Sequence, residues 1–78
     1  MITIPFSVED STKECLIQLR DIVDNRVVAD IFHGRCDPGV HAAQFDPQSV
    51  QGGLEAGYYA LYVIIGDEVE SYPVQYMP

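Results

Sequence analysis

The sequence predicts an α+β domain in which a small antiparallel or mixed β-sheet of about four strands carries one amphipathic α-helix packed on a face. Three observations predict this class: apolar residues recur at three- and four-residue steps before residue 24, alternating or aromatic-rich segments flank that stretch, and glycine and proline concentrate between residues 34 and 57. A chain of 78 residues can bury one core and not two. We therefore expect residues 1–78 to form a single compact domain.

The first expected element is a short strand at the start of the chain. Ile2, Ile4 and Phe6 alternate with more polar positions and with Pro5, which is the two-residue period of a strand. Proline has no backbone N–H to donate, so Pro5 favours a position at the edge of the sheet.

The second expected element is the amphipathic helix. Two spacings can cap its start, Ser7 before Asp10 and Ser11 before Glu14, and the second matches a capping box. Asn25 can end the helix in a left-handed conformation. The apolar positions at helical spacing are Val8, Cys15, Leu16, Leu19, Ile22 and Val23.

Residues 26–33 alternate enough to predict a second strand, and residues 34–57 predict a long loop. Within the loop, Asp37-Pro38-Gly39 suits a tight turn. Asp46 followed by Pro47 suits the cap and the first residue of a short helical turn. Long loops without regular structure are uncommon in compact domains and are often functional.

The last expected element is a β-hairpin over residues 58–76. Residues 58–65 are rich in aromatic and β-branched side chains, Gly66-Asp67-Glu68 interrupts them, and residues 69–76 continue the pattern. The first of these strands is apolar on both faces, which places it at the centre of a sheet. The second is more polar and suits an edge.

Charge is the strongest constraint on the class of partner. The chain has twelve acids and four bases, a formal net charge of −8, which repels nucleic acid and anionic membranes and attracts basic surfaces. All four bases precede residue 36, so residues 36–78 carry six acids and no base. All five tyrosines also lie in this half, and tyrosine is enriched at protein interfaces. The sequence therefore predicts an acidic, tyrosine-bearing binding surface in the C-terminal half.

Candidates for chemistry are few. His33, Cys36 and His41 offer three ligands for zinc, with Asp37 or Cys15 as a fourth, but structural zinc commonly uses paired short spacings, and unpaired polar residues at a strand end and turn explain the same pattern. His33 and Cys36 as base and nucleophile would need an electropositive setting, which only a neighbouring arginine supports. We expect no enzyme activity, no metal and no cofactor.

Residues 1–6 have neither the positive segment nor the long apolar segment of a signal peptide, and no apolar run approaches membrane-spanning length. Two cysteines are too few for a disulfide-stapled secreted domain. These features predict a cytoplasmic protein.

In its size, its acidity, its expected compact helix-and-hairpin plan, its acidic loop from Asp37 to Glu55 and its lack of catalytic motifs, the chain resembles the small phage-encoded inhibitors known as anti-CRISPR proteins. The resemblance implies a non-enzymatic inhibitor that binds the basic nucleic-acid-binding surface of a Cas effector complex in the host cytoplasm and blocks recruitment of target DNA. It does not imply direct binding to nucleic acid.

The expected partner-binding residues are Asp37, Asp46, Glu55, Tyr58, Asp67, Glu68, Glu70, Tyr72 and Tyr76. The alternative function is a small structural or regulatory subunit, of a phage assembly or antitoxin-like kind. Such a subunit would use the edge of the hairpin to bind a partner or to form a homodimer.

Overall fold

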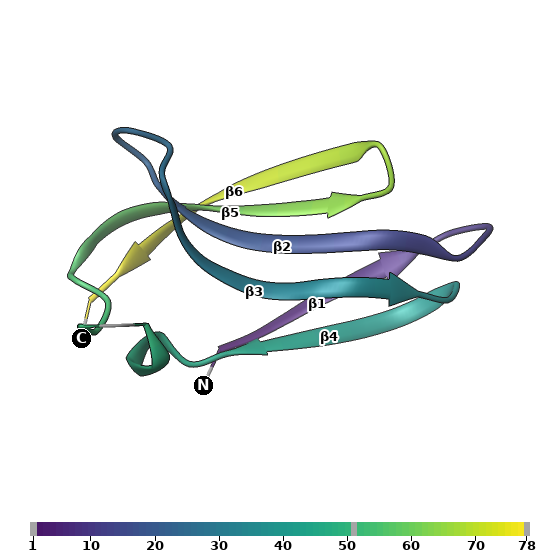
Figure 1. Ribbon diagram of the computed structural model, residues 1–78, viewed down its shortest axis with the longest axis horizontal. Helices are drawn as coiled ribbons and strands as arrows, with labels where there is room; N and C mark the ends of the chain where they lie inside the picture. The colour runs from purple at the N-terminus through teal and green to yellow at the C-terminus, as the bar shows by residue number, and fades with distance from the viewer. Residues whose placement is uncertain (1, 51, 78) are drawn as a thin grey trace.

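The computed structural model describes residues 2–50 and 52–77, which form six β-strands and one short 3-10 helix. Figure 1 shows their arrangement. The elements are β1 (Ile2–Val8), β2 (Lys13–Asp21), β3 (Val27–Cys36), β4 (Gly39–Phe45), η1 (Pro47–Ser49), β5 (Gly57–Ile65) and β6 (Glu68–Tyr76).

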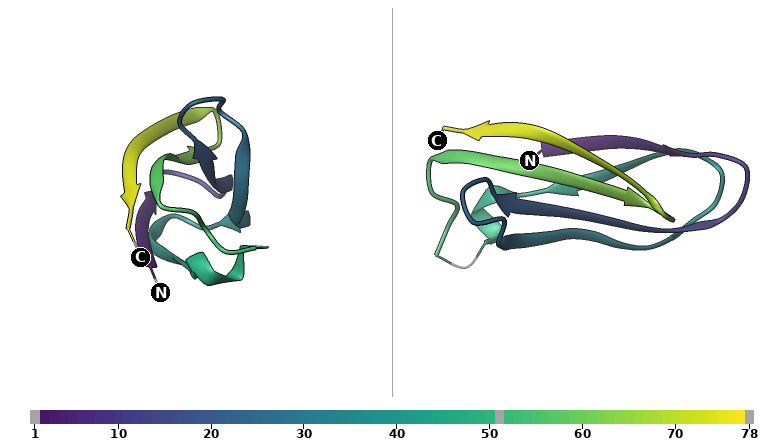
Figure 2. Two further views of the ribbon diagram at one scale, coloured as in Figure 1. Left: turned by 90° about the vertical axis from the view of Figure 1, so that its left-hand side faces the viewer. Right: turned by 90° about the horizontal axis from the view of Figure 1, so that it is seen from above.

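The strands form two antiparallel sheets that face each other (Figure 2). The main sheet has four strands in the order β3-β2-β5-β6, and the small sheet pairs β1 with β4. Because the small sheet has only two strands, it cannot cover the whole inner face of the main sheet. By these strand orders, β1 and β6 are both edge strands. They lie along the same side of the molecule.

The first four strands form one long hairpin that is folded over on itself. β2 pairs with β3, and β1 pairs with β4 from Ile2 opposite Phe45 to Val8 opposite Gly39. Residues 9–12 lead from β1 to β2, and residues 37–38 lead from β3 to β4. The chain therefore passes between the sheets twice at the same end of the molecule.

The core lies between the sheets and consists of the inward residues of each strand. Ile17 of β2 is fully buried, and its neighbours on the same face, Cys15 and Leu19, are 1% and 4% exposed. The other buried apolar residues are Ile4, Phe6, Val8, Cys36, Ala43, Phe45, Tyr59 and Val63. No buried polar side-chain atom lacks a partner within residues 2–50 and 52–77.

The structure contradicts the predicted α+β class, because the segment expected to form the helix is the end of β1, a bend and β2. Asp10 adopts a left-handed φ of 68°, which no helix interior accepts. In residues 13–21 burial alternates with the two-residue period of a strand. A short run of residues that is apolar on both faces fits the period of a helix as well as that of a strand. The decisive residue is Ile17, which the helical pattern omits and which is the most buried side chain.

The long loop expected over 34–57 is also interrupted by regular structure. Residues 34–36 complete β3, and residues 39–45 form β4, in which only Ala43 and Phe45 are buried. With so few large apolar side chains, β4 has a weak sequence signal, and its pairing with β1 holds it in place. The short helical turn is present: Asp46 accepts a hydrogen bond from the Gln48 N–H at 3.0 Å, with Pro47 as the first helical residue.

The hairpin of residues 58–76 is present as β5 and β6. Gly66, with φ of 62°, occupies the first position of its two-residue turn, as a type II′ turn requires. β5 is central and β6 is an edge strand, as their compositions predict. Pro5 lies in an edge strand, again in agreement with the sequence.

Candidate interaction surface

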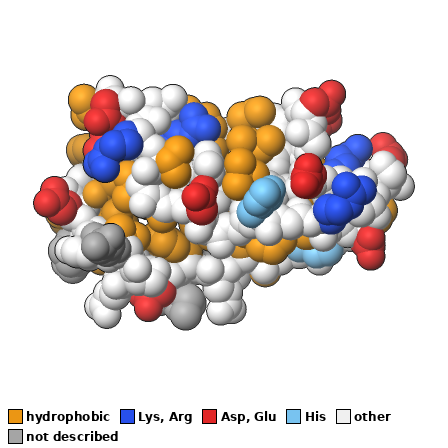
Figure 3. Space-filling model, in the orientation of Figure 1, with side chains coloured by type: hydrophobic (Ala, Val, Ile, Leu, Met, Phe, Trp, Pro, Cys, Tyr) orange, Lys and Arg blue, Asp and Glu red, His pale blue; other side chains and the backbone are white. Residues whose placement is uncertain are grey.

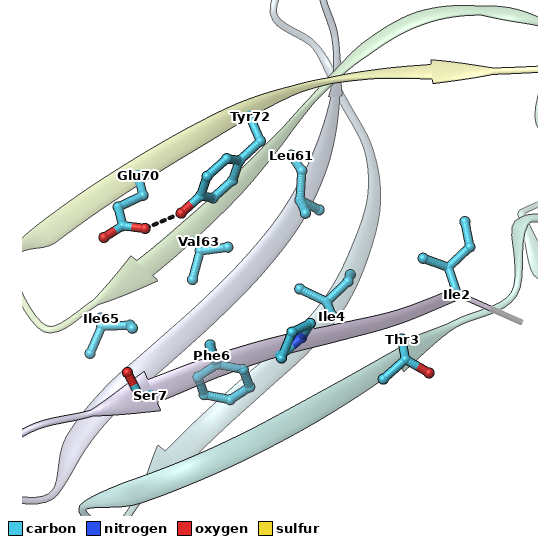
Figure 4. Close-up of a pocket in the computed structure, with 11 residues that line it drawn as sticks. Ile2, Thr3, Ile4, Phe6, Ser7, Leu61, Val63, Ile65, Glu70 and Tyr72 are labelled. Atoms are coloured by element: carbon cyan, nitrogen blue, oxygen red, sulfur yellow. Dashed lines mark hydrogen bonds between the residues drawn. The ribbon is translucent and has the colours of Figure 1, made fainter.

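A groove of about 500 Å³ runs along β1 on the open side of the molecule (Figure 4). One wall is formed by residues 2–7 of β1, and the floor by Leu61, Val63 and Ile65 of β5. These floor residues are two positions apart and point toward β1. The groove exists because no strand of the small sheet lies beside β1 on this side.

The far wall of the groove comes from β6, through Glu70 and Tyr72. In the strand register these residues lie opposite Val63 and Leu61, so they share the inward face of the main sheet although both remain exposed. The Tyr72 hydroxyl donates a hydrogen bond to the Glu70 carboxylate (Figure 4), and this bond raises the pKa of Tyr72. The groove lining contains one acid and no base.

One mouth of the groove opens toward a group of carboxylates, which we call the acidic end. The acidic end consists of Glu9, Asp10, Glu14, Asp37, Asp67 and Glu68. They come from the two crossings between the sheets, from the start of β2, and from the β5–β6 turn with the first residue of β6. Two contacts join these segments: the Gly66 N–H donates to the Glu14 carbonyl at 2.9 Å, and Thr12 Oγ1 donates to Asp37 Oδ1 at 2.7 Å.

Two bases, Lys13 and Arg35, lie at the same end, so the six acids leave it with a formal charge of −4. Within the part of the chain that the structure describes, the only ion pair joins Arg26 to Asp24 at 3.9 Å, at the opposite end. The acidic end is therefore not neutralised by direct ion pairs. On the face that Figure 3 shows, acidic and basic side chains lie close together at the end drawn on the right.

The residues predicted to bind a partner do not form one surface. Asp37, Asp67 and Glu68 belong to the acidic end, and Glu70 and Tyr72 line the groove. The remaining four are Asp46, Glu55, Tyr58 and Tyr76, all located toward the other end, where β4 and β6 finish and β5 begins. Tyr58 is 63% exposed, and Tyr76 is partly buried against the core.

Sequence reasoning missed two contributions. Glu9, Asp10 and Glu14 belong to the half of the chain with the milder charge, and the folded-over hairpin brings them beside residues 37 and 67–68. The wall of the groove, residues 2–7, was expected only as an edge strand. The incorrect prediction of a helix in place of β2 is the reason that both were missed, because a helix there removes the crossing that brings residues 9–12 to this end.

The remaining tyrosines have structural contacts. Tyr59 is buried, and its hydroxyl donates to the Glu55 carbonyl at 2.6 Å. Burial, followed by the charges of Glu55 and Asp21, raises the pKa of Tyr59. Tyr62 lies on the outer face of the main sheet, where the Arg20 guanidinium carbon is 4.1 Å from its ring centroid.

The structure does not gather the residues considered for metal binding or nucleophilic catalysis into one site. His33 is exposed and Cys36 is buried, since residues three apart on a strand point to opposite faces. His41 stacks on Phe6, and its Nε2 lies 2.6 Å from the Asp37 carbonyl oxygen. No group of three or more His, Cys, Asp or Glu side chains that could hold a metal ion occurs within residues 2–50 and 52–77.

The two cysteines are free thiols in the core. Cys15 is opposite Gly34 and Cys36 is opposite Lys13, so the thiols are diagonal neighbours on the inward faces of β2 and β3. Burial, followed by the neighbouring Cys36, raises the pKa of the Cys15 thiol. A buried thiol with a raised pKa is a poor nucleophile, so Cys15 behaves as an apolar core residue.

The chain matches no protein-family model, no curated protein sequence and no solved structure. Among the residues that the structure describes, no helix is long and apolar enough to cross a membrane.

Proposed function

We propose that this protein is a non-enzymatic binding module that docks on the basic surface of a protein partner through its acidic end. The observation that carries this proposal is the convergence of six carboxylates from three separate segments on one end of the molecule. Unneutralised charge of one sign steers a partner of the opposite sign and raises the rate of association. The groove beside this end supplies the apolar area that exposed charges alone lack.

The narrower form of the proposal concerns the identity of the partner. A protein surface that holds nucleic acid is built with lysine and arginine spaced for phosphates, so it offers many cations to the acidic end. Binding there would block DNA recruitment, as the resemblance to anti-CRISPR proteins implies. The free, buried cysteines are compatible with the reducing cytoplasm in which such a partner operates.

The test mixes the purified protein with Cas effector complexes on a sizing column over a series of salt concentrations. A complex that weakens as salt rises supports the proposal, because screening shortens the reach of exposed charges. The triple variant Glu9→Lys, Asp10→Lys, Asp67→Lys should abolish the complex. The control makes the same charge change at the other end, with Asp24→Lys, Asp46→Lys and Glu55→Lys, and should retain it.

Three results count against the proposal: no complex with any effector, a complex that is indifferent to salt, or equal losses in the two triple variants. Equal losses would show that only the net charge of −8 matters and not its location.

A further inference from the structure

The outer edge of β1 has backbone groups without a strand partner. Among residues 2–50 and 52–77, β1 pairs only with β4. Proline is tolerated in a sheet where its missing N–H faces away from the neighbouring strand, which assigns the backbone of Pro5 to the outer edge. By the two-residue alternation of a strand, Thr3 and Ser7 also present their N–H and carbonyl groups to that edge. β1 can therefore bond an added strand on both sides of Pro5.

The space beside this edge fits a strand. The groove follows β1 over residues 2–7, a length typical of strands in globular proteins. Its floor residues Leu61, Val63 and Ile65 alternate along β5, so they match the side-chain period of an added strand. Leu61 and Ile65 are only partly covered, and Tyr72 on the far wall is 48% exposed.

Charge selects the occupant. Glu70 lies in the groove, Glu68 is the next inward residue of β6 toward the acidic end, and no lysine or arginine lines the groove. A second copy of this chain would bring another formal charge of −8, which opposes self-association. Nucleic acid and anionic lipid are disfavoured by the same sign. A segment that combines basic and apolar residues can pack its apolar side chains on the floor and place its basic side chains against the acidic far wall.

We propose that the groove binds an extended segment of the partner protein, which adds as a strand to the free edge of β1, packs alternate apolar side chains on Leu61 and Ile65, and places a lysine or arginine against Glu70. This inference rests on the proposed function and specifies how the partner is held. The free edge of β6 is a poorer site for an added strand than the edge of β1, because β6 contributes only two inward side chains, Glu70 and Tyr72, to the groove.

The experiment selects binders from a phage-displayed library of random ten-residue peptides. The enriched peptides are then synthesised with a fluorescent label, and their affinities are measured by fluorescence anisotropy. We expect enriched sequences in which apolar and basic residues alternate. In nuclear magnetic resonance spectra, bound peptide should shift the amide signals of Thr3 and Ser7 and the methyl signals of Leu61 and Ile65.

Two matched pairs of variants test the geometry. Ser7→Pro removes one outward N–H and should weaken binding about fivefold, the typical worth of one backbone hydrogen bond, whereas Ser7→Ala keeps the N–H and the affinity. Glu70→Lys should weaken binding by a similar factor, whereas Asp30→Lys, with the same change of charge on the outer face of the main sheet, should not. Far-ultraviolet circular dichroism checks that each variant is folded, and Glu70→Lys provides the test if Ser7→Pro does not fold.

The inference is overturned if no peptide is enriched, if the enriched peptides bind Ser7→Pro and Glu70→Lys as tightly as the parent, or if the shifted signals lie on the outer face of the main sheet. Its failure differs from failure of the proposed function. A partner complex that the acidic-end triple variant abolishes, and that Ser7→Pro and Glu70→Lys leave intact, would retain the docking function and remove the strand addition.

Discussion

Thr12 and Asp37 are 25 residues apart in the chain, and their side chains are joined by a hydrogen bond of 2.7 Å between Thr12 Oγ1 and Asp37 Oδ1. The bond connects the two crossings at which the long hairpin folds over on itself. Asp37 also accepts at its backbone carbonyl, 2.6 Å from His41 Nε2. One residue therefore links the first crossing, the second crossing and β4.

Removal of this side-chain bond should destabilise the fold by a small and measurable amount. We expect Thr12→Val and Asp37→Ala each to lower the free energy of unfolding by about 0.5–1 kcal/mol, because the bond is exposed and exchanges with water. In a double-mutant cycle followed by urea denaturation, the double variant should lose less than the sum of the two. Additive losses would mean that the two side chains do not interact in solution.

Truncation of Ile17 should have the largest effect of any single aliphatic substitution. Its side chain is 0% exposed, so Ile17→Ala should cost about 2–5 kcal/mol through lost burial and the cavity left behind. Val23→Ala is the control, since Val23 is 91% exposed and should change stability by less than about 0.5 kcal/mol. If residues 13–21 were helical in solution, Ile17 would not be uniquely sensitive, and circular dichroism would show helix in place of strand.

Tyr59 should make stability depend on alkaline pH. Folding raises the pKa of Tyr59 through burial first and then through Glu55 and Asp21. The folded state thus holds the phenolic proton more tightly than the unfolded state. This stabilisation is complete below the ordinary tyrosine pKa of about 10 and is lost as pH rises through the higher pKa of the folded state.

Tyr59→Phe tests this dependence. At neutral pH the variant should lose about 1 kcal/mol, because the hydrogen bond to the Glu55 carbonyl is absent. Above a pH of about 10, the free energy of unfolding measured in urea titrations should fall less steeply with pH for the variant than for the parent. Some decline should remain, since the pKa values of Tyr72 and Cys15 are also raised. Parallel curves for parent and variant would show that Tyr59 does not contribute.

The cysteines should be protected from thiol reagents in the folded protein. Cys15 is 1% exposed and Cys36 is 8% exposed, and the pKa of Cys15 is raised, so little thiolate is available. We expect slow reaction with Ellman's reagent in native buffer and rapid reaction of both thiols in concentrated urea. Rapid reaction of one thiol in native buffer, with the other protected, would show that one of the two core positions opens to solvent.

The sequence predicts much of the local structure around these positions. The alternation in residues 2–6, the helical turn after Asp46 and the β5–β6 hairpin all follow from local chemistry. Asn25 is left-handed, with φ of 58°, but it lies in the turn between β2 and β3 and does not end a helix as predicted. Proline fixes its own φ, and asparagine and glycine tolerate the left-handed backbone that other residues avoid, whatever the rest of the chain does. These elements could therefore be predicted without knowledge of their neighbours.

The conformation of residues 13–21 could not be predicted in this way. The run Cys15-Leu16-Ile17 is apolar at three consecutive positions, which satisfies a helix and a strand equally. β2 is a strand because β3 and β5 pair with it on both sides, and its pairing with β5, which is distant along the chain, leaves no local signal. β4 is decided in the same way by β1.

The sequence by itself determined the acidity, the absence of bases after residue 35, the edge position of Pro5 and the hairpin at the C-terminal end. Only the tertiary structure decided which carboxylates lie together and where the sheet is left open. The physical reason is that net charge is a sum over the chain, whereas a surface depends on strand pairing. Folding the first hairpin over on itself brings Glu9, Asp10 and Glu14 to the end that holds Asp37 and Asp67, and it leaves β1 with a free edge.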